Sequence, residues 1–291
     1  MTVNNNMTPF PFYTDLEEQN GRKSWAYGVQ YPFFVPLSTL MPFQILRAHR
    51  SRSISFVRLM KTDGTHVAGL TDEMIQNGLH ITSFESDGYD VISYPAIVPL
   101  FLDVPVGQYY LEVSDGVQMF YSEVFTAIGS TDGYLKLEWW DRSNLYYDGG
   151  LIQYVDQLYP NRYKNTVYVC SDLGMPAYES EEEGEEREGV FFPNSQISYK
   201  VYRFRFLAPE FLTDALRIAW LSDYVRVTDP LGRVYNCNTF VPTVEWQDGG
   251  YLANVEAEFR TNTVVKKYGL GYYDDGSDAD FNNDFNNDYL I

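Results

Sequence analysis

Short apolar runs separated by Asp-Gly pairs constrain the fold of this chain more than any other sequence feature. The runs are rich in aromatic and β-branched side chains and include SISFVRLM, YDVISY, QYYLEV and MFYSEVF. Such runs are typical of strands, because these side chains pack well on a pleated surface. Asp-Gly pairs, which favour tight hairpins, lie beside them at 63–64, 87–88 and 115–116. The pattern predicts a mainly β protein.

The spacing of the runs predicts two β-sandwich domains. The first is expected over residues 25–127 and the second over residues 134–269. The segment between them, IGSTDG at 128–133, is small, polar and turn-forming, which predicts a linker. Residues 1–24 show little periodicity, so we expect an extended N-terminal arm that orders on binding a partner.

One amphipathic helix is predicted at 209–222, within the second sandwich. Pro209 suits the first helical position, where its missing N–H costs nothing. Apolar residues then recur at helical spacing on one stripe, formed by Leu212, Ala215, Leu216, Ala219 and Trp220. We therefore expect a single helix packed against the second sandwich.

Acidic residues are concentrated in two segments. The chain has 40 Asp and Glu against 21 Lys and Arg, a net charge of −19. Residues 179–188 hold seven Glu and one Arg, and residues 270–291 hold six Asp with no Lys or Arg. Like charges repel one another and stay solvated, which predicts a mobile acidic loop over 179–189 and a disordered acidic tail over 270–291. The loop supplies three interface candidates, Glu181, Glu182 and Glu183. Such acidity disfavours a protein that reads nucleic acid.

One basic stretch opposes this acidity. The segment RAHRSRSISFVRLMK at 47–61 contains no acidic residue and five basic ones, Arg47, Arg50, Arg52, Arg58 and Lys61. One interpretation is a solvated strand edge guarded by charge. The other is a docking patch for an acidic segment of a neighbouring subunit.

No catalytic, cofactor-binding or metal site is predicted. The three His residues lack ligand spacing, neither Cys lies in a CxxC motif, and GxSxG and phosphate-binding loops are absent. The segment DADFNND at 278–284 spaces its acidic residues like a calcium loop, but Asn283 and Tyr289 replace the required Gly and Glu. Weak calcium binding by a flexible tail is the most that this segment predicts.

The segment EWWD at 138–141 combines aromatic and acidic side chains. Adjacent strand residues point to opposite faces, so Trp139 and Trp140 cannot form one sugar platform. We expect one ring in the core and the other at a neighbouring surface, and both are interface candidates. A carbohydrate-binding or adhesion module that uses exposed Trp and Tyr is the alternative function. A hydrolase that uses Glu138 and Asp141 is a third interpretation.

Four runs resemble structural proteins from virions of tailed phages that infect gut Bacteroidetes, the crAss-like group included. The first, VPVGQYYLEVSDGVQMFYSEVFTA at 104–127, is similar to the last hairpin of a fibronectin- or immunoglobulin-like domain. LEWWDRSNLYYDGGLIQY follows at 137–154. The last two resemble the helix and closing strands of tail-ring, tail-tube and distal-tail sandwiches; they are PEFLTDALRIAWLSDYVRV at 209–227 and VEWQDGGYLANVEAEFRTNTVVKKYG at 244–269.

The resemblance implies a fibronectin- or immunoglobulin-like first sandwich and a tail-protein-like second one. It further implies a homo-oligomeric ring in the neck or tail of a virion, assembled in the bacterial host cytoplasm beside other tail or neck proteins. DNA would pass such a ring without specific binding, because carboxylates repel phosphates. No membrane partner is expected, since no segment approaches about 18 uninterrupted apolar residues. These are scaffold patterns, so no catalytic residue is implied by them.

Overall fold

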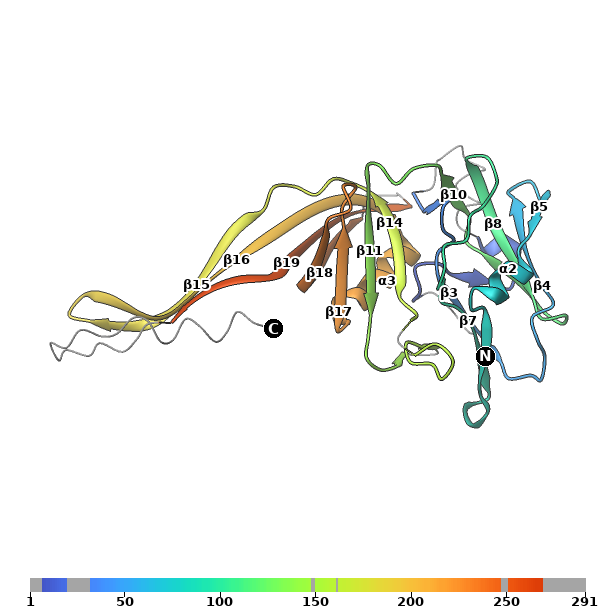
Figure 1. The fold of residues 1–291 in the computed structure, drawn as a ribbon, viewed down its shortest axis with the longest axis horizontal. Helices are drawn as coiled ribbons and strands as arrows, with labels where there is room; N and C mark the ends of the chain where they lie inside the picture. The colour runs from blue at the N-terminus through green and yellow to red at the C-terminus, as the bar shows by residue number, and fades with distance from the viewer. Residues whose placement is uncertain (1–6, 20–31, 148–149, 161, 247–250, 269–291) are drawn as a thin grey trace. The chain divides into compact units, whose positions relative to one another are not determined.

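Strands dominate the computed structural model, which describes residues 7–19, 32–147, 150–160, 162–246 and 251–268. The predicted mainly β class, with one packed helix, is confirmed. The predicted acidic tail at 270–291, with its calcium-loop-like segment, lies outside the described residues. Figure 1 shows the order of the elements along the chain.

The elements up to residue 128 are mostly short strands. Their bounds are β1 Phe12–Tyr13, η1 Leu16–Glu18, β2 Phe34–Pro36, β3 Phe43–Ala48, β4 Phe56–Lys61, β5 His66–Gly69, α2 Thr71–Gln76, β6 His80–Phe84, η2 Glu85–Asp87, β7 Tyr89–Tyr94, β8 Gly107–Ser114, β9 Met119–Ser122 and β10 Phe125–Ile128.

The later described elements include four strands of more than ten residues and the longer helix. Their bounds are β11 Tyr134–Trp140, β12 Leu145–Tyr147, β13 Gly150–Ile152, β14 Asn165–Cys170, β15 Ala177–Arg187, β16 Val190–Pro209, α3 Glu210–Leu221, β17 Tyr224–Thr228, β18 Val234–Trp246 and β19 Leu252–Tyr268.

The three Asp-Gly pairs connect paired antiparallel strands. The turns at Gly64, Gly88 and Gly116 join β4 to β5, β6 to β7 and β8 to β9. All three glycines have positive φ, a conformation that side chains with a Cβ rarely adopt. The hairpins predicted from these pairs are therefore present.

One sheet contains most of the strands. Its hydrogen-bonded order is β1-β9-β8-β10-β2-β14-β11-β17-β18-β19-β16-β15, with β4 and β5 joined through β8. Strand β2 pairs in parallel with β10 and antiparallel with β14. Because β10 and β14 lie on opposite sides of the predicted linker in sequence, the sheet is continuous across that boundary.

The chain divides into two compact units, but not at the predicted linker. The first unit comprises residues 1–177 and 200–262, and the second comprises residues 178–199 and 263–291. Residues 128–133 form the connection between β10 and β11, inside the first unit. One apolar core runs through both predicted sandwiches, and the rings of Phe33 and Phe211 meet across it at 5.4 Å. The boundary at 128–133 is therefore wrong, because a shared core and a shared sheet outweigh a polar turn.

The described part of the predicted N-terminal arm belongs to this core. Phe10 and Phe12 are buried, and Phe10 makes edge-on ring contacts with Phe33, Phe43 and Phe125. Strand β1 pairs with β9. The expectation of an extended arm is wrong for residues 7–19, because this segment buries Phe10 and Phe12 in the core and pairs β1 with β9.

Helix α3 matches the predicted helix closely, from Glu210 to Leu221. Pro209 takes the N-cap position, and Leu212, Ala215, Leu216 and Ala219 are buried as predicted. Trp220 is 61% exposed, so it does not continue the stripe. Phe211 and Ile218 are buried in addition, so the apolar face lies slightly to one side of the predicted one.

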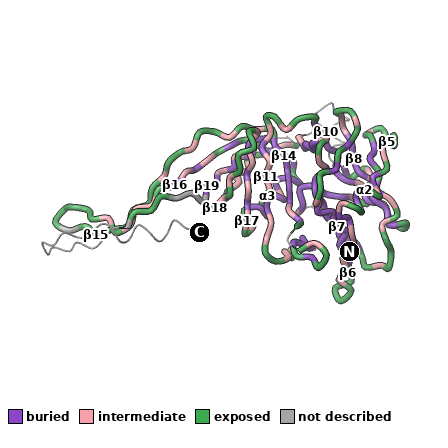
Figure 2. The backbone as a smooth tube through the Cα atoms, in the orientation of Figure 1, coloured by how far each residue is buried: buried purple, intermediate pink, exposed green. Residues whose placement is uncertain are grey.

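The predicted acidic loop at 179–189 is wrong, because its residues form a strand and a tight turn. Strand β15 pairs with β16, and the two are joined at Glu188 and Gly189, which both have positive φ. Two successive positive φ values are typical of the tight turns that join hairpin strands. The carboxylates stay in water along an open ribbon, so their mutual repulsion does not prevent pairing; Figure 2 shows β15 coloured largely as exposed.

Candidate functional site

Some kinds of site have no counterpart in the part of the chain that the structure describes. There, no three His, Cys, Asp or Glu side chains gather in a way that could hold a metal ion. Within the same ranges, neither α-helix has the length and apolarity of a membrane span.

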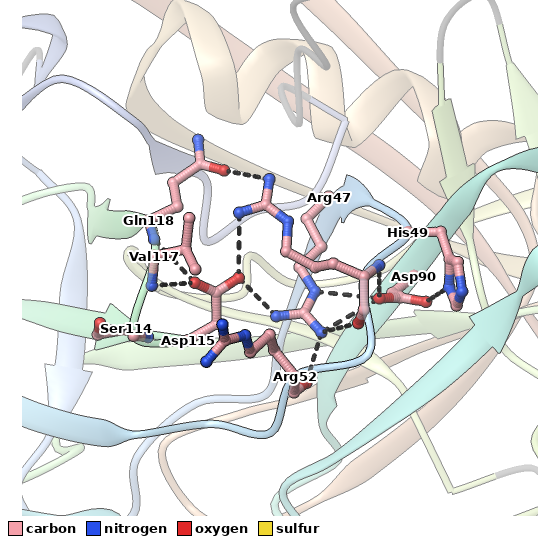
Figure 3. A network of polar contacts seen from close by, with 10 residues as sticks. Arg47, His49, Arg52, Asp90, Ser114, Asp115, Val117 and Gln118 are labelled. Carbon is pink, nitrogen blue, oxygen red and sulfur yellow. Dashed lines mark hydrogen bonds and ion pairs between the residues drawn. The ribbon is translucent and has the colours of Figure 1, made fainter.

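The first residue of the basic stretch, Arg47, is buried and paired. Its Nη1 donates to Oδ2 of Asp115 at 2.6 Å and its Nη2 lies 3.1 Å from Oδ2 of Asp90, with all three side chains fully shielded from solvent. Figure 3 shows the guanidinium between the two carboxylates. Arg47 also donates to the backbone carbonyls of Arg50 and Arg52. It is therefore unavailable to a neighbouring subunit, and its assignment as an interface residue is wrong.

Strand register and a turn bring these charges together. Arg47 on β3 lies directly opposite Asp90 on β7. Asp115 begins the β8–β9 turn, where its Oδ1 accepts hydrogen bonds from the backbone N–H groups of Val117 and Gln118. A buried carboxylate with such donors stays charged, so charge-assisted hydrogen bonds join β3, β7 and the β8–β9 turn.

The other basic residues of the stretch are dispersed. Arg50 is 27% exposed and donates to Gln118, with Asp115 3.5 Å away. Arg52, Arg58 and Lys61 are exposed, and the guanidinium of Arg58 lies 3.9 Å above the Phe56 ring. Strand β4, which carries Arg58 and Lys61, lies between β5 and β8. The strand-edge interpretation is therefore wrong for β4, because both of its sides are paired.

The buried aspartates predict how stability depends on pH. Burial raises the pKa of Asp90, Asp115 and Asp156, but hydrogen bonds outweigh burial, so each pKa lies below its ordinary value. The main donors are His49 to Asp90, the backbone N–H groups of Gln118 and Val117 to Asp115, and His80 to Asp156. A carboxyl whose folded pKa is depressed stabilises the fold above its unfolded pKa, about 4. We expect the free energy of unfolding to fall as the pH drops below about 4 towards the folded pKa values.

Urea titrations at several pH values measure this dependence, and Asp115→Asn tests its origin. The variant should be less stable at pH 7 and should lose less stability on acidification. If the free energy of unfolding of the variant falls with decreasing pH as steeply as that of the unchanged protein, Asp115 is not a source of the pH dependence.

The two tryptophans lie on opposite faces, as predicted. Trp139 is fully buried in the core. The Trp140 ring stacks on Tyr224 at 5.3 Å and 17°, and it also contacts cations, with Nζ of Lys164 at 4.4 Å and the guanidinium of Arg226 at 5.1 Å. Neither ring offers an open stacking face, so neither supports the alternative of a carbohydrate platform.

The acidic residues that flank the tryptophans do not converge. Oε1 of Glu138 accepts from Lys136 at 2.8 Å, and Oε2 lies 4.0 Å from Arg226. Asp141 instead accepts from the Asp223 backbone N–H at 2.7 Å and from the Ser222 hydroxyl. The carboxylates are held by different partners, so their arrangement does not support the hydrolase interpretation.

A pocket of about 320 Å³ lies beside this charged face. We call it the basic pocket. One wall is apolar and comes from residues 40–42 and 95–97; the other carries the side chains of Lys136, Glu138, Arg162 and Lys164. Ala96 in the apolar wall has φ of 50°, a strained backbone conformation for a residue with a Cβ.

The basic pocket carries an excess of positive charge. Lys136 pairs with Glu138, which leaves the charges of Arg162 and Lys164. Burial lowers the pKa of Lys164, Glu138 raises it, and the cations of Arg226 and Lys136 lower it further, so the net shift is downward. An anion in the pocket would relieve this repulsion.

Sequence reasoning missed the basic pocket, because its cations come from separate strands and loops. Lys136 and Glu138 alternate along β11, and Lys164 precedes β14, the neighbour of β11. The available signal was the pair of basic residues in NRYKN at 161–165, just before a strand.

The three Glu interface candidates lie in the segment that we call the acidic hairpin, residues 178–199. Glu181 accepts from the Tyr199 hydroxyl at 2.6 Å and Glu182 accepts from the Gln196 amide at 3.0 Å. Glu183 is exposed. Past the turn, Phe191 and Phe192 are 48% and 41% exposed, so the same hairpin presents aromatic and acidic groups to solvent.

Comparisons with known proteins give no family for this chain. No family model matches it. No curated protein matches it either. A complex of Dpr2 Ig1-Ig2 with DIP-Theta Ig1-Ig3 is 10% identical over 82% of this chain and 93% of that chain, with a TM-score of 0.13. A likeness at that score carries no argument about fold or function.

Proposed function

We propose that this chain is a non-enzymatic structural subunit of a tailed-phage virion that forms a ring with its own copies in the neck or tail. The class of particle rests on the resemblance of residues 104–127, 137–154, 209–227 and 244–269 to virion proteins. Self-association rests on one observation in the structure, the acidic hairpin.

The acidic hairpin lacks a core of its own. Among its described residues only Tyr199 is buried, and Val190, Phe191 and Phe192 are all more than 40% exposed. A narrow β ribbon without a hydrophobic face packed on other elements is marginally stable in water. When a partner surface covers exposed aromatic side chains on such a ribbon, their removal from water stabilises the complex. The hairpin therefore suits a contact between subunits better than it suits an isolated monomer.

Charge supports the proposed place beside a DNA path. The net charge is −19, and the Glu side chains of β15 at positions 181–183, 185 and 186 are exposed. Carboxylates that face a lumen repel phosphates, which would let DNA pass without binding. Within the proposal, the partners are copies of this chain and neighbouring tail or neck proteins, and the location is the virion.

Measurements on the purified chain and on phage particles test this function. Electron microscopy and mass photometry of the purified chain should show closed rings, and mass spectrometry of phage particles should detect the chain. A protein that stays monomeric at high concentration and is absent from virions would contradict the proposal.

A further inference from the structure

We propose that the basic pocket of one subunit receives the tip of the acidic hairpin, residues 183–192, from a second copy of this chain. This inference rests on the proposed function, because it requires that copies associate. It assigns the acceptor surface to Lys136, Arg162 and Lys164 rather than to the basic stretch at 47–61.

The charges of the two surfaces are complementary. Arg162 and Lys164 give the pocket a positive excess on a chain whose net charge is −19. Within the hairpin tip, Glu183 and Glu186 are exposed. An anionic segment would lower the repulsion between the pocket cations, and complementary charges speed and orient association.

The apolar parts of the two surfaces also correspond. The apolar wall of the pocket combines the buried residues Leu40, Met41 and Pro42 with the partly exposed Ile97, next to the charged wall. The hairpin tip carries Phe191 and Phe192 within a few residues of its carboxylates. A volume of about 320 Å³ suits a side chain, since even small-ligand sites begin near that size. One occupant with an aromatic ring and a carboxylate would contact both walls.

The two strands of the hairpin tip approach each other closely. A Cβ placed on Gly184 would collide with the Phe192 carbonyl and the Phe191 ring, so only glycine allows the two strands to approach this closely here. The tight turn at Glu188 and Gly189 closes the end. The tip is thus a slim ribbon with a defined turn.

Repetition of this contact between copies would form a ring. Pocket and hairpin are different surfaces, so each subunit offers one of each. A contact between unlike surfaces is heterologous, and repetition of it gives a closed ring when the rotation between subunits closes.

A charge exchange between two variants tests the contact. One variant carries Arg162→Glu, which changes an exposed residue of the pocket; the other carries Glu183→Lys and Glu186→Lys in the hairpin. Each variant alone should associate roughly tenfold or more weakly than the unchanged chain, because the pocket loses its positive excess in one variant and the hairpin tip loses its negative charge in the other. Mixed in equal amounts, the two should regain assembly, with alternating subunits in each ring.

Arg52→Glu is the matched control, because it reverses an exposed arginine of the basic stretch. It should leave assembly unchanged. Size-exclusion chromatography with mass photometry reads out every sample, and recovery in the mixture shows that both variants are folded.

The outcomes separate this inference from the proposed function. If the unchanged chain forms rings and Arg162→Glu forms them equally well, the pocket is not the contact, while the structural function stands. If neither the mixture nor a single chain carrying both sets of changes regains assembly, the pocket and the hairpin do not contact each other. If the unchanged chain never associates, the proposed function fails as well.

Discussion

Replacing Arg47 with Met should destabilise the protein by about 3–5 kcal/mol, the cost of leaving a buried charge without its partner. The guanidinium and the carboxylates of Asp90 and Asp115, which Figure 3 draws with their contacts, are fully shielded from solvent. Removing the cation leaves two carboxylates in a poorly solvated site. The free energy of unfolding from urea titration at pH 7 measures the effect.

Two comparisons make the Arg47 result specific. Arg52→Met removes an exposed guanidinium from the same stretch and should change stability by less than about 0.5 kcal/mol. Adding Asp90→Asn and Asp115→Asn to Arg47→Met should recover part of the loss, because the uncompensated charges are gone. A loss below about 1 kcal/mol in Arg47→Met would mean that solvent reaches the network.

Replacing Trp139 with Ala should cost about 3–5 kcal/mol, the usual range for deleting a large buried aromatic ring. The side chain is fully buried, and β11 holds it between Asn165 of β14 and Val225 of β17. The neighbouring strands are fixed by backbone hydrogen bonds, so they cannot collapse fully into the space. Thermal and urea unfolding would measure the loss.

Trp139→Phe is the matched control for cavity size. The Nε1 atom of Trp139 has no hydrogen-bond partner among the described residues, so Phe removes an unpaired donor while it keeps most of the ring volume. Trp139→Phe should lower the free energy of unfolding clearly less than Trp139→Ala does. Trp140→Ala should cost about 1 kcal/mol, the scale of one stacking and cation contact at a partly exposed site. Equal losses for Trp139→Ala and Trp140→Ala would contradict their different burial.

The errors in the candidate site have a common physical origin. Arg47 looked like an exposed cation because its nearest acidic partners, Asp90 and Asp115, lie 43 and 68 residues away in sequence. The basic pocket went unnoticed because Lys136, Arg162 and Lys164 do not form a run. Sequence windows detect charges that are adjacent along the chain, whereas ion pairs and pockets depend on charges that are adjacent in space.

Local signals alone determined the strand-rich class, the three Asp-Gly hairpins and the helix with its buried stripe. Each of these features depends on residues within a single turn, strand or helix. Tertiary structure decided that residues 7–19 enter the core, that one sheet passes the expected linker, and that the Glu-rich segment becomes a strand. Those features depend on apolar burial and backbone pairing between distant segments, and the free energy of such contacts can outweigh local preferences for coil, turn or solvation.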